Sequence, residues 1–338
     1  MRYHQIGGDN GVRVSEIGFG CWTMGGPTYH SLKGIPIGWA DVDEDDVLKG
    51  IKTGLDAGVN HFDNADIYGY GRAERMLADS LTKLGVKRED VVIASKVGHA
   101  SGTAPHAYQP RHIRNQCEQT LSNLKTDTID IYYLHHDNWA PDGEVGALPE
   151  AAGVMHELKQ EGKIRVIGQS AYSDAGFARS AEVLKPAVFQ SWASLIYDNF
   201  IKPGAAVQDI MSDYGITFVA FGPLGKGVLL DKFDPDNPPQ FEPGDVRANQ
   251  PFFTGEWLKK LKPALDTLKQ RYGSETADLA SVCCRFVAAH PNVASVIPGF
   301  RNERQAACNV RGGDDEPFTD DDVAFCRDLF AALQTNTS

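Results

Sequence analysis

Short apolar runs alternate with longer amphipathic stretches from residue 17 almost to the last residues of the chain. The runs are typical of buried strands, and the stretches repeat apolar residues at the three- and four-residue spacing of helices. Eight strand–helix units in one chain predict an α/β fold, the (β/α)₈ TIM barrel. The expected strands are 17–20, 59–62, 91–95, 129–134, 164–168, 187–190, 216–220 and 294–298.

The two ends of the chain add further elements to this barrel. Residues 2–6 and 12–16 flank the turn sequence GGDNG and predict an N-terminal β-hairpin. After the eighth strand, RNERQAACNV begins a predicted C-terminal helix. Because the last strand is needed to close the barrel, we expect residues 1–338 to form a single domain.

The predicted loops differ in length. The longer ones follow strands, at 21–43, 97–109, 135–148 and 222–254. A barrel gathers these loops at its C-terminal face, where sites form. The polar, proline-rich segment 234–251 is either a linker or a flap over a ligand. We favour a flap, because the barrel is incomplete before this segment.

A doubly wound open sheet is the competing fold. Its dinucleotide site needs G-x-G-x-x-G directly after the first strand. The sequence there is GFGCWTMGG, in which Gly18 and Gly20 fit but the next glycine is Gly25. We therefore interpret these glycines as loop residues and retain the barrel.

Composition restricts the possible partners. Hydrophobic residues make up 42% of the chain and charged residues 23%, which is typical of globular proteins. The net charge of −12 argues against non-specific binding to nucleic acid or to an anionic membrane. No apolar run approaches the ~20 residues that cross a bilayer, and the first residues lack the apolar centre of a signal peptide. The six cysteines form no C-x-x-C pair, so we expect reduced thiols, no zinc site and a cytoplasmic location.

Polar residues follow three neighbouring predicted strands. Asp63 follows the second strand, Lys96 the third and His135 the fourth, while Tyr68 lies in the loop five residues after Asp63. Adjacent strands lie about 4.8 Å apart, and the carboxyl ends of barrel strands meet at one mouth. We therefore expect these four side chains to lie together. Taken singly, each is also common as a turn, packing or solvated residue.

The four residue types suit the reduction of a carbonyl group. A carbonyl that receives a hydride develops negative charge on oxygen and needs a positioned proton donor. We expect Asp63 to keep Lys96 charged, and Lys96 to lower the pKa of Tyr68, which exchanges the proton. A neutral His135 would donate a hydrogen bond to the carbonyl oxygen.

A metal-dependent hydrolase built on Asp63, His135 and His136 is an alternative. The sequence has no H-x-H pair after the first strand to complete such a metal site, and Lys96 would repel the metal ion. We therefore predict no metal site.

The motifs that carry these residues resemble those of the aldo-keto reductase family, in its bacterial, longer-looped branch. GVNHFDNADIYGYGRAERMLADSL matches the family's G-x-N-x-F-D-T-A-x-x-Y-G, with Asn64 in place of threonine, and IASKVG, IDIYYLHH and GKIRVIGQS match in the same order. The resemblance implies a catalytic set of Asp63, Tyr68, Lys96 and His135. It also implies reversible hydride transfer with NADPH as the usual cofactor, and NAD as the less expected one.

The resemblance further implies where the cofactor binds. Ser170 and Gln190 would hold the carboxamide, although Ala171 replaces the family asparagine, and Cys308 stands where the family often has glutamate. Phe221 would stack on the nicotinamide. The implied cofactor residues are Ser170, Gln190, Phe221, Gly222, Pro223, Leu224, Gly225, Lys226, Gly227, Gly299, Arg301, Gln305 and Asn309.

Substrate residues are implied less fully. Trp22, Tyr68 and His135 would contact a small carbonyl compound or a sugar. Other residues expected near the mouth are Trp39, Trp139, Trp192, Tyr197, Asp198 and Asn199, the last two as binders of hydroxyl groups or as surface loop residues. A non-catalytic or regulatory subunit of the same fold is the second functional reading, and the sequence leaves both a monomer and a homo-oligomer open.

Overall fold

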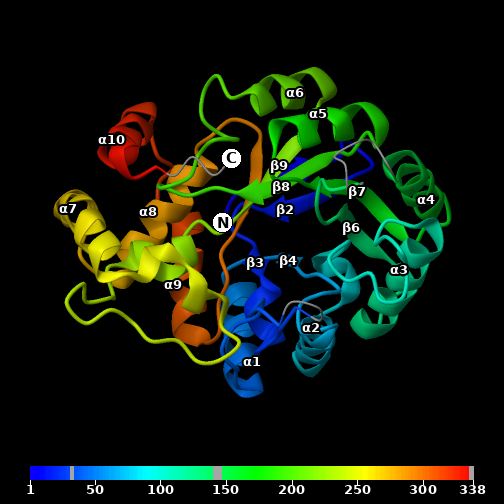
Figure 1. Cartoon of the computed structure of the whole chain (residues 1–338), viewed down its shortest axis with the longest axis horizontal. Helices are drawn as coiled ribbons and strands as arrows, with labels where there is room; N and C mark the ends of the chain where they lie inside the picture. The colour runs from blue at the N-terminus through cyan, green and yellow to red at the C-terminus, as the bar shows by residue number, and fades with distance from the viewer. Residues whose placement is uncertain (31–33, 140–146, 335–338) are drawn as a thin grey trace.

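Eight parallel strands form the centre of the computed structural model, which describes residues 1–30, 34–139 and 147–334. They are hydrogen-bonded in chain order, as the predicted barrel requires (Figure 1). The strands are β3 (Phe19–Gly20), β4 (His61–Asp63), β5 (Val92–Val97), β6 (Ile129–Leu134), β7 (Ile164–Ser170), β8 (Val188–Trp192), β9 (Thr217–Phe221) and β10 (Val293–Ile297). Two parallel bridges, Ile17–Val296 and Gly20–Gly299, join the first strand to the last and close the barrel.

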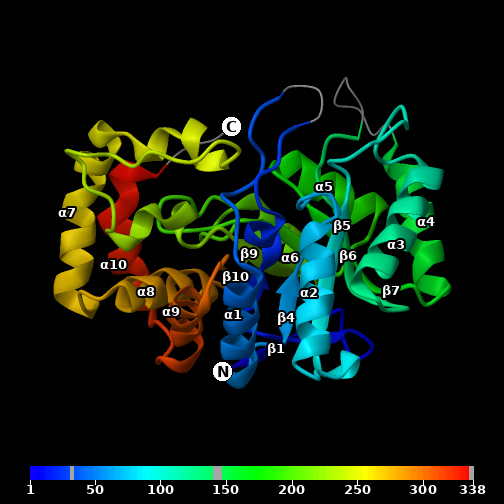
Figure 2. The ribbon, with the colours of Figure 1, turned by 90° about the horizontal axis from the view of Figure 1, so that it is seen from below.

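The N-terminal hairpin closes one end of the barrel. β1 (Tyr3–Ile6) and β2 (Val12–Ser15) pair antiparallel, as predicted. Ile6 and Val14 are buried in one apolar cluster with Val92 of β5 and Val219 of β9, which come from opposite sides of the barrel. In Figure 2, β1 lies at the lower end, and residues 26–30 and 34–43, between η1 (Cys21–Gly25) and α1 (Glu44–Asp56), lie at the upper end. The opposite, C-terminal end is therefore the one available for a site.

Amphipathic helices surround the strands (Figure 1). Their apolar faces are buried against the barrel, which is the reason for the spacing seen in the sequence. Three of the helices begin at residues that favour a helix start, because Asp43 and Ser173 cap helices with their side chains and Pro110 occupies a first position. The predicted helices are α1 (Glu44–Asp56), α2 (Arg72–Lys83), α3 (Pro110–Leu124), α4 (Leu148–Gln160), α5 (Asp174–Val183), α6 (Ala206–Tyr214), α8 (Thr276–Ala288) and α9 (Glu303–Asp314).

Two helices were not predicted, α7 (Gly255–Tyr272) and α10 (Asp320–Phe330). They lie beside each other outside α8, where Arg271 of α7 and Asp322 of α10 form an ion pair with N···O 2.8 Å (Figure 1). Strand bounds also differ, because Asp63 and Lys96 lie within their strands instead of after them. Within the described residues, no helix combines the length and apolarity needed to span a membrane.

Candidate active site

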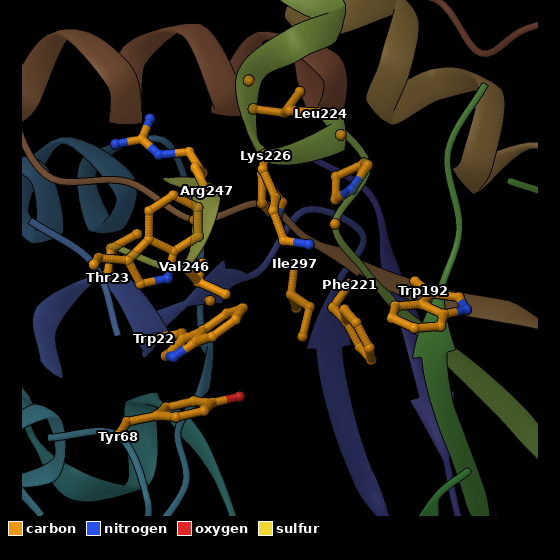
Figure 3. Close-up of a pocket in the computed structure, with 18 of the residues that line it drawn as sticks. Trp22, Thr23, Tyr68, Trp192, Phe221, Leu224, Lys226, Val246, Arg247 and Ile297 are labelled. Carbon is orange, nitrogen blue, oxygen red and sulfur yellow. The ribbon is translucent and has the colours of Figure 1, made fainter. Parts of the chain in front are cut away.

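A large cavity, about 1430 Å³ in volume, opens at the C-terminal ends of the strands. Tyr68 and Trp22 lie on one side of it, Phe221 and Trp192 on the other, and Lys226 points into the space between them (Figure 3). Apart from Lys96 and Ser170, every residue of the predicted catalytic and cofactor sets, together with Trp22, lines this cavity. The strand ends therefore bring together residues that lie up to 287 positions apart, from Trp22 to Asn309.

Lys96 and Asp63 form a buried ion pair beneath the cavity. Lys96 is fully buried and Asp63 is 2% exposed. The ammonium of Lys96 donates to Asp63 Oδ1 and to the backbone oxygen of Asn64, the latter at 2.7 Å. Gln190 donates to the second oxygen, Asp63 Oδ2, at 2.8 Å. The carboxylate thus has strong donors on both oxygens, which offsets the cost of burying the two charges.

Tyr68 is held directly against this pair. Lys96 Nζ donates to Tyr68 Oη at 3.2 Å and lies 4.9 Å from the centre of the phenol ring. On its other face the ring stacks with Trp22, with centroids 6.0 Å apart and an interplanar angle of 24°. Trp22 is itself fixed by a hydrogen bond of 3.0 Å from its indole N–H to the oxygen of Ile37. The hydroxyl group points into the cavity (Figure 3).

The expected lowering of the Tyr68 pKa is wrong. Burial raises the pKa of Tyr68 well above its ordinary value, and the negative charge of Asp63 adds to this rise. The physical reason is that Asp63 balances the charge of Lys96, which leaves little net positive field at the phenol. Tyr68 therefore carries its proton at neutral pH, as a proton donor must.

His135 lines the cavity next to Tyr68. The two rings meet edge to face with centroids 6.0 Å apart, and His99 packs on His135 at 4.3 Å. Burial, the neighbouring histidine and Lys96 lower the pKa of His135 well below its ordinary value, so the ring is neutral, as expected. The competing His136 is excluded from the cavity lining, because its Nε2 bonds to the oxygen of Gly98 at 2.9 Å.

The two residues expected to hold the cofactor carboxamide, Ser170 and Gln190, lie in different layers of the site. Gln190 lines the cavity, whereas Ser170, its neighbour across β7 and β8, is fully buried and does not. Ser170 Oγ has no hydrogen-bond partner in the described structure. The neighbouring Ala171 is also fully buried. Ser170 was expected to hold the cofactor carboxamide directly, but its side chain lies behind the cavity wall.

A left-handed turn follows β9 at the far side of the cavity. Gly225, Lys226 and Gly227 have φ of 55°, 56° and 93° in succession. Only glycine adopts such angles without strain, so the two glycines allow Lys226 to turn inward. Lys226 Nζ contacts Gln250 Oε1 at 3.3 Å, and burial lowers the pKa of Lys226.

Basic side chains gather beyond this turn. Arg301 was predicted, but Lys232, Arg247 and Arg304 were not, and all four line the cavity. Burial and the three arginines lower the pKa of Lys232 to about 8. Arg247 is paired with Asp245 at 2.6 Å, whereas none of the other three forms an ion pair with a described carboxylate. Unpaired cations crowded in one cavity are favourable for an anion.

Comparison with known proteins identifies the family. The model of the Aldo/keto reductase family matches residues 16–330. This chain belongs to the aldo-keto reductases. It is 30% identical to aldo-keto reductase YhdN of Bacillus subtilis over 90% of this chain and 86% of that protein. It is 28% identical to a probable voltage-gated potassium channel subunit beta of Oryza sativa over 96% of this chain and 94% of that protein.

A solved structure supports the same assignment. The structure of glycerol dehydrogenase AKR11B4 from Gluconobacter oxydans covers 98% of this chain and 95% of its own, with a TM-score of 0.77 and 25% identity. The (β/α)₈ barrel and oxidoreductase class predicted from the sequence are therefore confirmed, and the family uses nicotinamide cofactors.

The predicted flap of this aldo-keto reductase lies along the cavity. Val246, Arg247 and Gln250 line it, and the segment is tied to the loop after β3 by a bridge between Gly38 and Asp245. The guanidinium of Arg247 also lies 5.0 Å from the ring centre of Trp39. Buried pairing explains why this polar, proline-rich segment is ordered without forming a strand or long helix.

Some expected mouth residues of the reductase lie elsewhere. Asp198 is fully buried and accepts from Arg327 Nε at 3.0 Å, so neither of its expected roles, hydroxyl binder or surface residue, is correct. Trp139 packs with Tyr108 and Ile113 in the apolar cluster under the outer helices, outside the cavity lining. In the described part of the chain, no three His, Cys, Asp or Glu side chains are grouped to hold a metal ion. The hydrolase alternative therefore has no ligand set there.

Proposed function

We propose that this chain is an NADPH-dependent carbonyl reductase that works reversibly on small aldehydes, ketones or sugars. The observation that carries the proposal is the contact of Lys96 Nζ with both Asp63 and Tyr68 Oη beneath a large cavity. A partly buried, protonated phenol next to a buried ammonium is an arrangement suited to proton transfer to an oxyanion.

The four catalytic side chains would divide the work as follows. Bound NADPH supplies the hydride to the carbonyl carbon. Tyr68 gives its proton to the oxygen, and Lys96 stabilises the phenolate that this transfer leaves. Because the stabilisation grows only as the phenolate forms, it lowers the barrier more than it strengthens substrate binding. Neutral His135 donates a hydrogen bond that orients the carbonyl oxygen.

The residues of the cavity fit the cofactor. Gln190, with Ser170 behind it, lies at the strand ends near the catalytic set, and Phe221 offers an aromatic face. Gly225 and Gly227 allow close approach to the backbone near Lys226. These residues would hold the nicotinamide end and the pyrophosphate.

The basic cluster favours NADP over NAD. Lys232, Arg301 and Arg304 line the cavity without a described acidic partner, and a 2′-phosphate would supply the missing negative charge. The amide groups are also arranged for adenosine binding. Gln305 accepts from the backbone N–H of Arg301 at 2.9 Å, and Asn309 donates to Gly299 at 3.1 Å, which leaves the other end of each amide for a ligand.

The test follows the absorbance of NADPH. It should fall during reaction with a panel of aldehydes that includes glyceraldehyde, and it should rise when NADP⁺ is mixed with glycerol. Glycerol compounds are included because a similar protein is named a glycerol dehydrogenase. Turnover that depends on Tyr68 supports the proposal. Tight NADPH binding without turnover across the panel would instead favour a regulatory subunit, a role suggested by the similarity to a probable channel subunit.

A further inference from the structure

A second cavity, about 390 Å³ in volume, lies beside the first and contains two buried acidic residues. Asp66 belongs to the loop between Asp63 and Tyr68, and its backbone N–H donates to the oxygen of Lys96 at 3.2 Å. Glu74 belongs to α2. Asp66 is 7% exposed and Glu74 is fully buried. The catalytic set uses neither residue.

The two carboxyl groups differ in the hydrogen bonds that they accept. Glu74 accepts hydrogen bonds from three neutral side chains, at 2.7 Å from Ser95, 2.9 Å from Thr120 and 2.7 Å from Asn123. Both oxygens of Asp66 are buried and have no hydrogen-bond partner in the described structure. Such a group is costly to bury unless a ligand or a proton completes it.

Among the described residues, neither Asp66 nor Glu74 forms an ion pair. Arg75 is the one basic side chain that lines the second cavity, and its guanidinium donates to Asn123 Oδ1 at 3.2 Å. It lies beyond ion-pair distance of both carboxyl groups, as does Lys96, which is taken by Asp63. Burial and the charge of Glu74 raise the pKa of Asp66 well above its ordinary value, which is the electrostatic result of this imbalance.

The lining selects the kind of ligand. Two carboxyl groups repel an anion, and the described residues offer no third acidic or histidine ligand for a divalent metal ion. Unused acceptors on Asp66 suit a compact cation that carries several N–H donors. We propose that the second cavity binds a primary ammonium group, held by Asp66 with Glu74 supplying further negative charge.

The ammonium group has two possible sources, a free amine or a substrate. The second cavity shares Tyr70, Ala100 and Gln116 with the wall of the first. A substrate whose carbonyl group lies beside Tyr68 would therefore extend its other end past these three shared residues toward Asp66. The substrate source rests on the proposed function, whereas ammonium binding itself does not.

The first experiment measures binding without turnover. Methylammonium chloride is titrated into the full chain by calorimetry, with ionic strength held constant by tetramethylammonium chloride, which has no N–H donor. We expect Asp66→Asn to weaken methylammonium binding at least ~10-fold, the effect of losing one charge-assisted hydrogen bond, and Arg75→Gln to leave it equal or tighter. The matched control is Asp79→Asn. Asp79 is an exposed carboxylate on α2, the helix of Glu74 and Arg75, and it pairs with Lys125.

Three outcomes would overturn the proposal: equal methylammonium binding by the chain and by Asp66→Asn, no binding by either, or equal binding of potassium ions, which would indicate charge alone. A second experiment identifies the source. If the substrate carries the group, Asp66→Asn raises KM for an aldehyde with a terminal ammonium but not for the uncharged aldehyde of equal length. If both KM values stay unchanged while methylammonium binding is lost, the site serves a free amine. Failure of all turnover would count against the reductase proposal and leave the calorimetric result intact.

Discussion

Lys96 Nζ lies 3.2 Å from Tyr68 Oη while it also donates to the Asp63 carboxylate. The pairing with Asp63 cancels most of the field of the ammonium on the neutral phenol, yet the N–H donor still points at the phenol oxygen. Lys96 therefore acts on Tyr68 mainly when Tyr68 has lost its proton.

Replacing Tyr68 with Phe removes the proton donor and leaves the ring in place against Trp22. We expect kcat for aldehyde reduction to fall by about 10²–10⁴-fold, the usual contribution of a general acid. The dissociation constant of NADPH, measured by fluorescence titration, should stay within about twofold. Tyr214→Phe, at an exposed tyrosine on α6, is the control. Unchanged kcat in Tyr68→Phe would contradict the assignment.

Replacing Lys96 with Met leaves Asp63 buried without its cation. We expect the free energy of unfolding to fall by about 3–5 kcal/mol, the usual cost of removing one partner of a buried pair. Adding Asp63→Asn should recover part of this loss, because an uncharged side chain costs less to bury. Urea unfolding of both single variants and the double variant checks the prediction. Additive losses would mean that the two groups are not coupled.

The raised pKa of Tyr68 predicts different pH profiles for the two directions. Reduction needs the protonated phenol and neutral His135, and both are present throughout the neutral range, so its kcat should change little from about pH 6 to 9. Alcohol oxidation needs the phenolate, so its rate should rise with pH over the same range. Steady-state rates in both directions test this, and a rise of the reduction rate with pH would oppose it.

Replacing Arg301 with Ala removes one unpaired cation from the basic cluster. We expect the dissociation constant of NADPH to rise about tenfold or more, because a charge-assisted hydrogen bond is worth roughly 1.5–3 kcal/mol. NADH, without the 2′-phosphate, should be affected much less. Arg179→Ala, on the exposed side of α5, is the control for a general loss of charge. Equal losses for both nucleotides would place Arg301 away from the phosphate.

Two buried histidines should make the fold sensitive to acid. Burial lowers the pKa of His61 and His290 to about 4, below the ordinary value of 6.5. Between about pH 6.5 and pH 4 the unfolded chain binds these protons and the folded chain does not, so stability falls as pH falls. Each histidine contributes up to ~1.4 kcal/mol per pH unit. Urea midpoints across this range, with His61→Gln showing a shallower slope, provide the check.

The sequence predicted the barrel because strand and helix periodicities alternate, and each helix buries one face. It did not assign α7, although Leu258, Leu261, Leu265 and Leu268 have helical spacing, and the helix contains Pro263, a residue that usually interrupts helices. The closeness of Asp63, Tyr68, Lys96 and His135 was predictable because the ends of barrel strands converge. The side-chain direction of Ser170 and the pKa of Tyr68 were not, because both depend on neighbours from other strands.

The basic cluster shows a related limit. Lys232, Arg247 and Arg304 are ordinary surface-type residues in the sequence, and they meet in the cavity because the turn after β9, the flap and α9 fold beside one another. The formation of this basic cluster therefore depends on contacts between segments, and the spacing of residues within one segment does not predict such contacts.

The closure of the barrel by a two-residue β3 and two isolated bridges to the last strand has a consequence for biosynthesis. The nascent chain cannot seal its ring until Val296 and Gly299 have left the ribosome, late in translation. Until then the wall of the cavity at the C-terminal strand ends is incomplete, and the earlier strands can form only an open, partly exposed sheet. Assembly of the pocket therefore waits for the last strand, and helper proteins that shield unfinished sheets would act on the chain before that strand emerges.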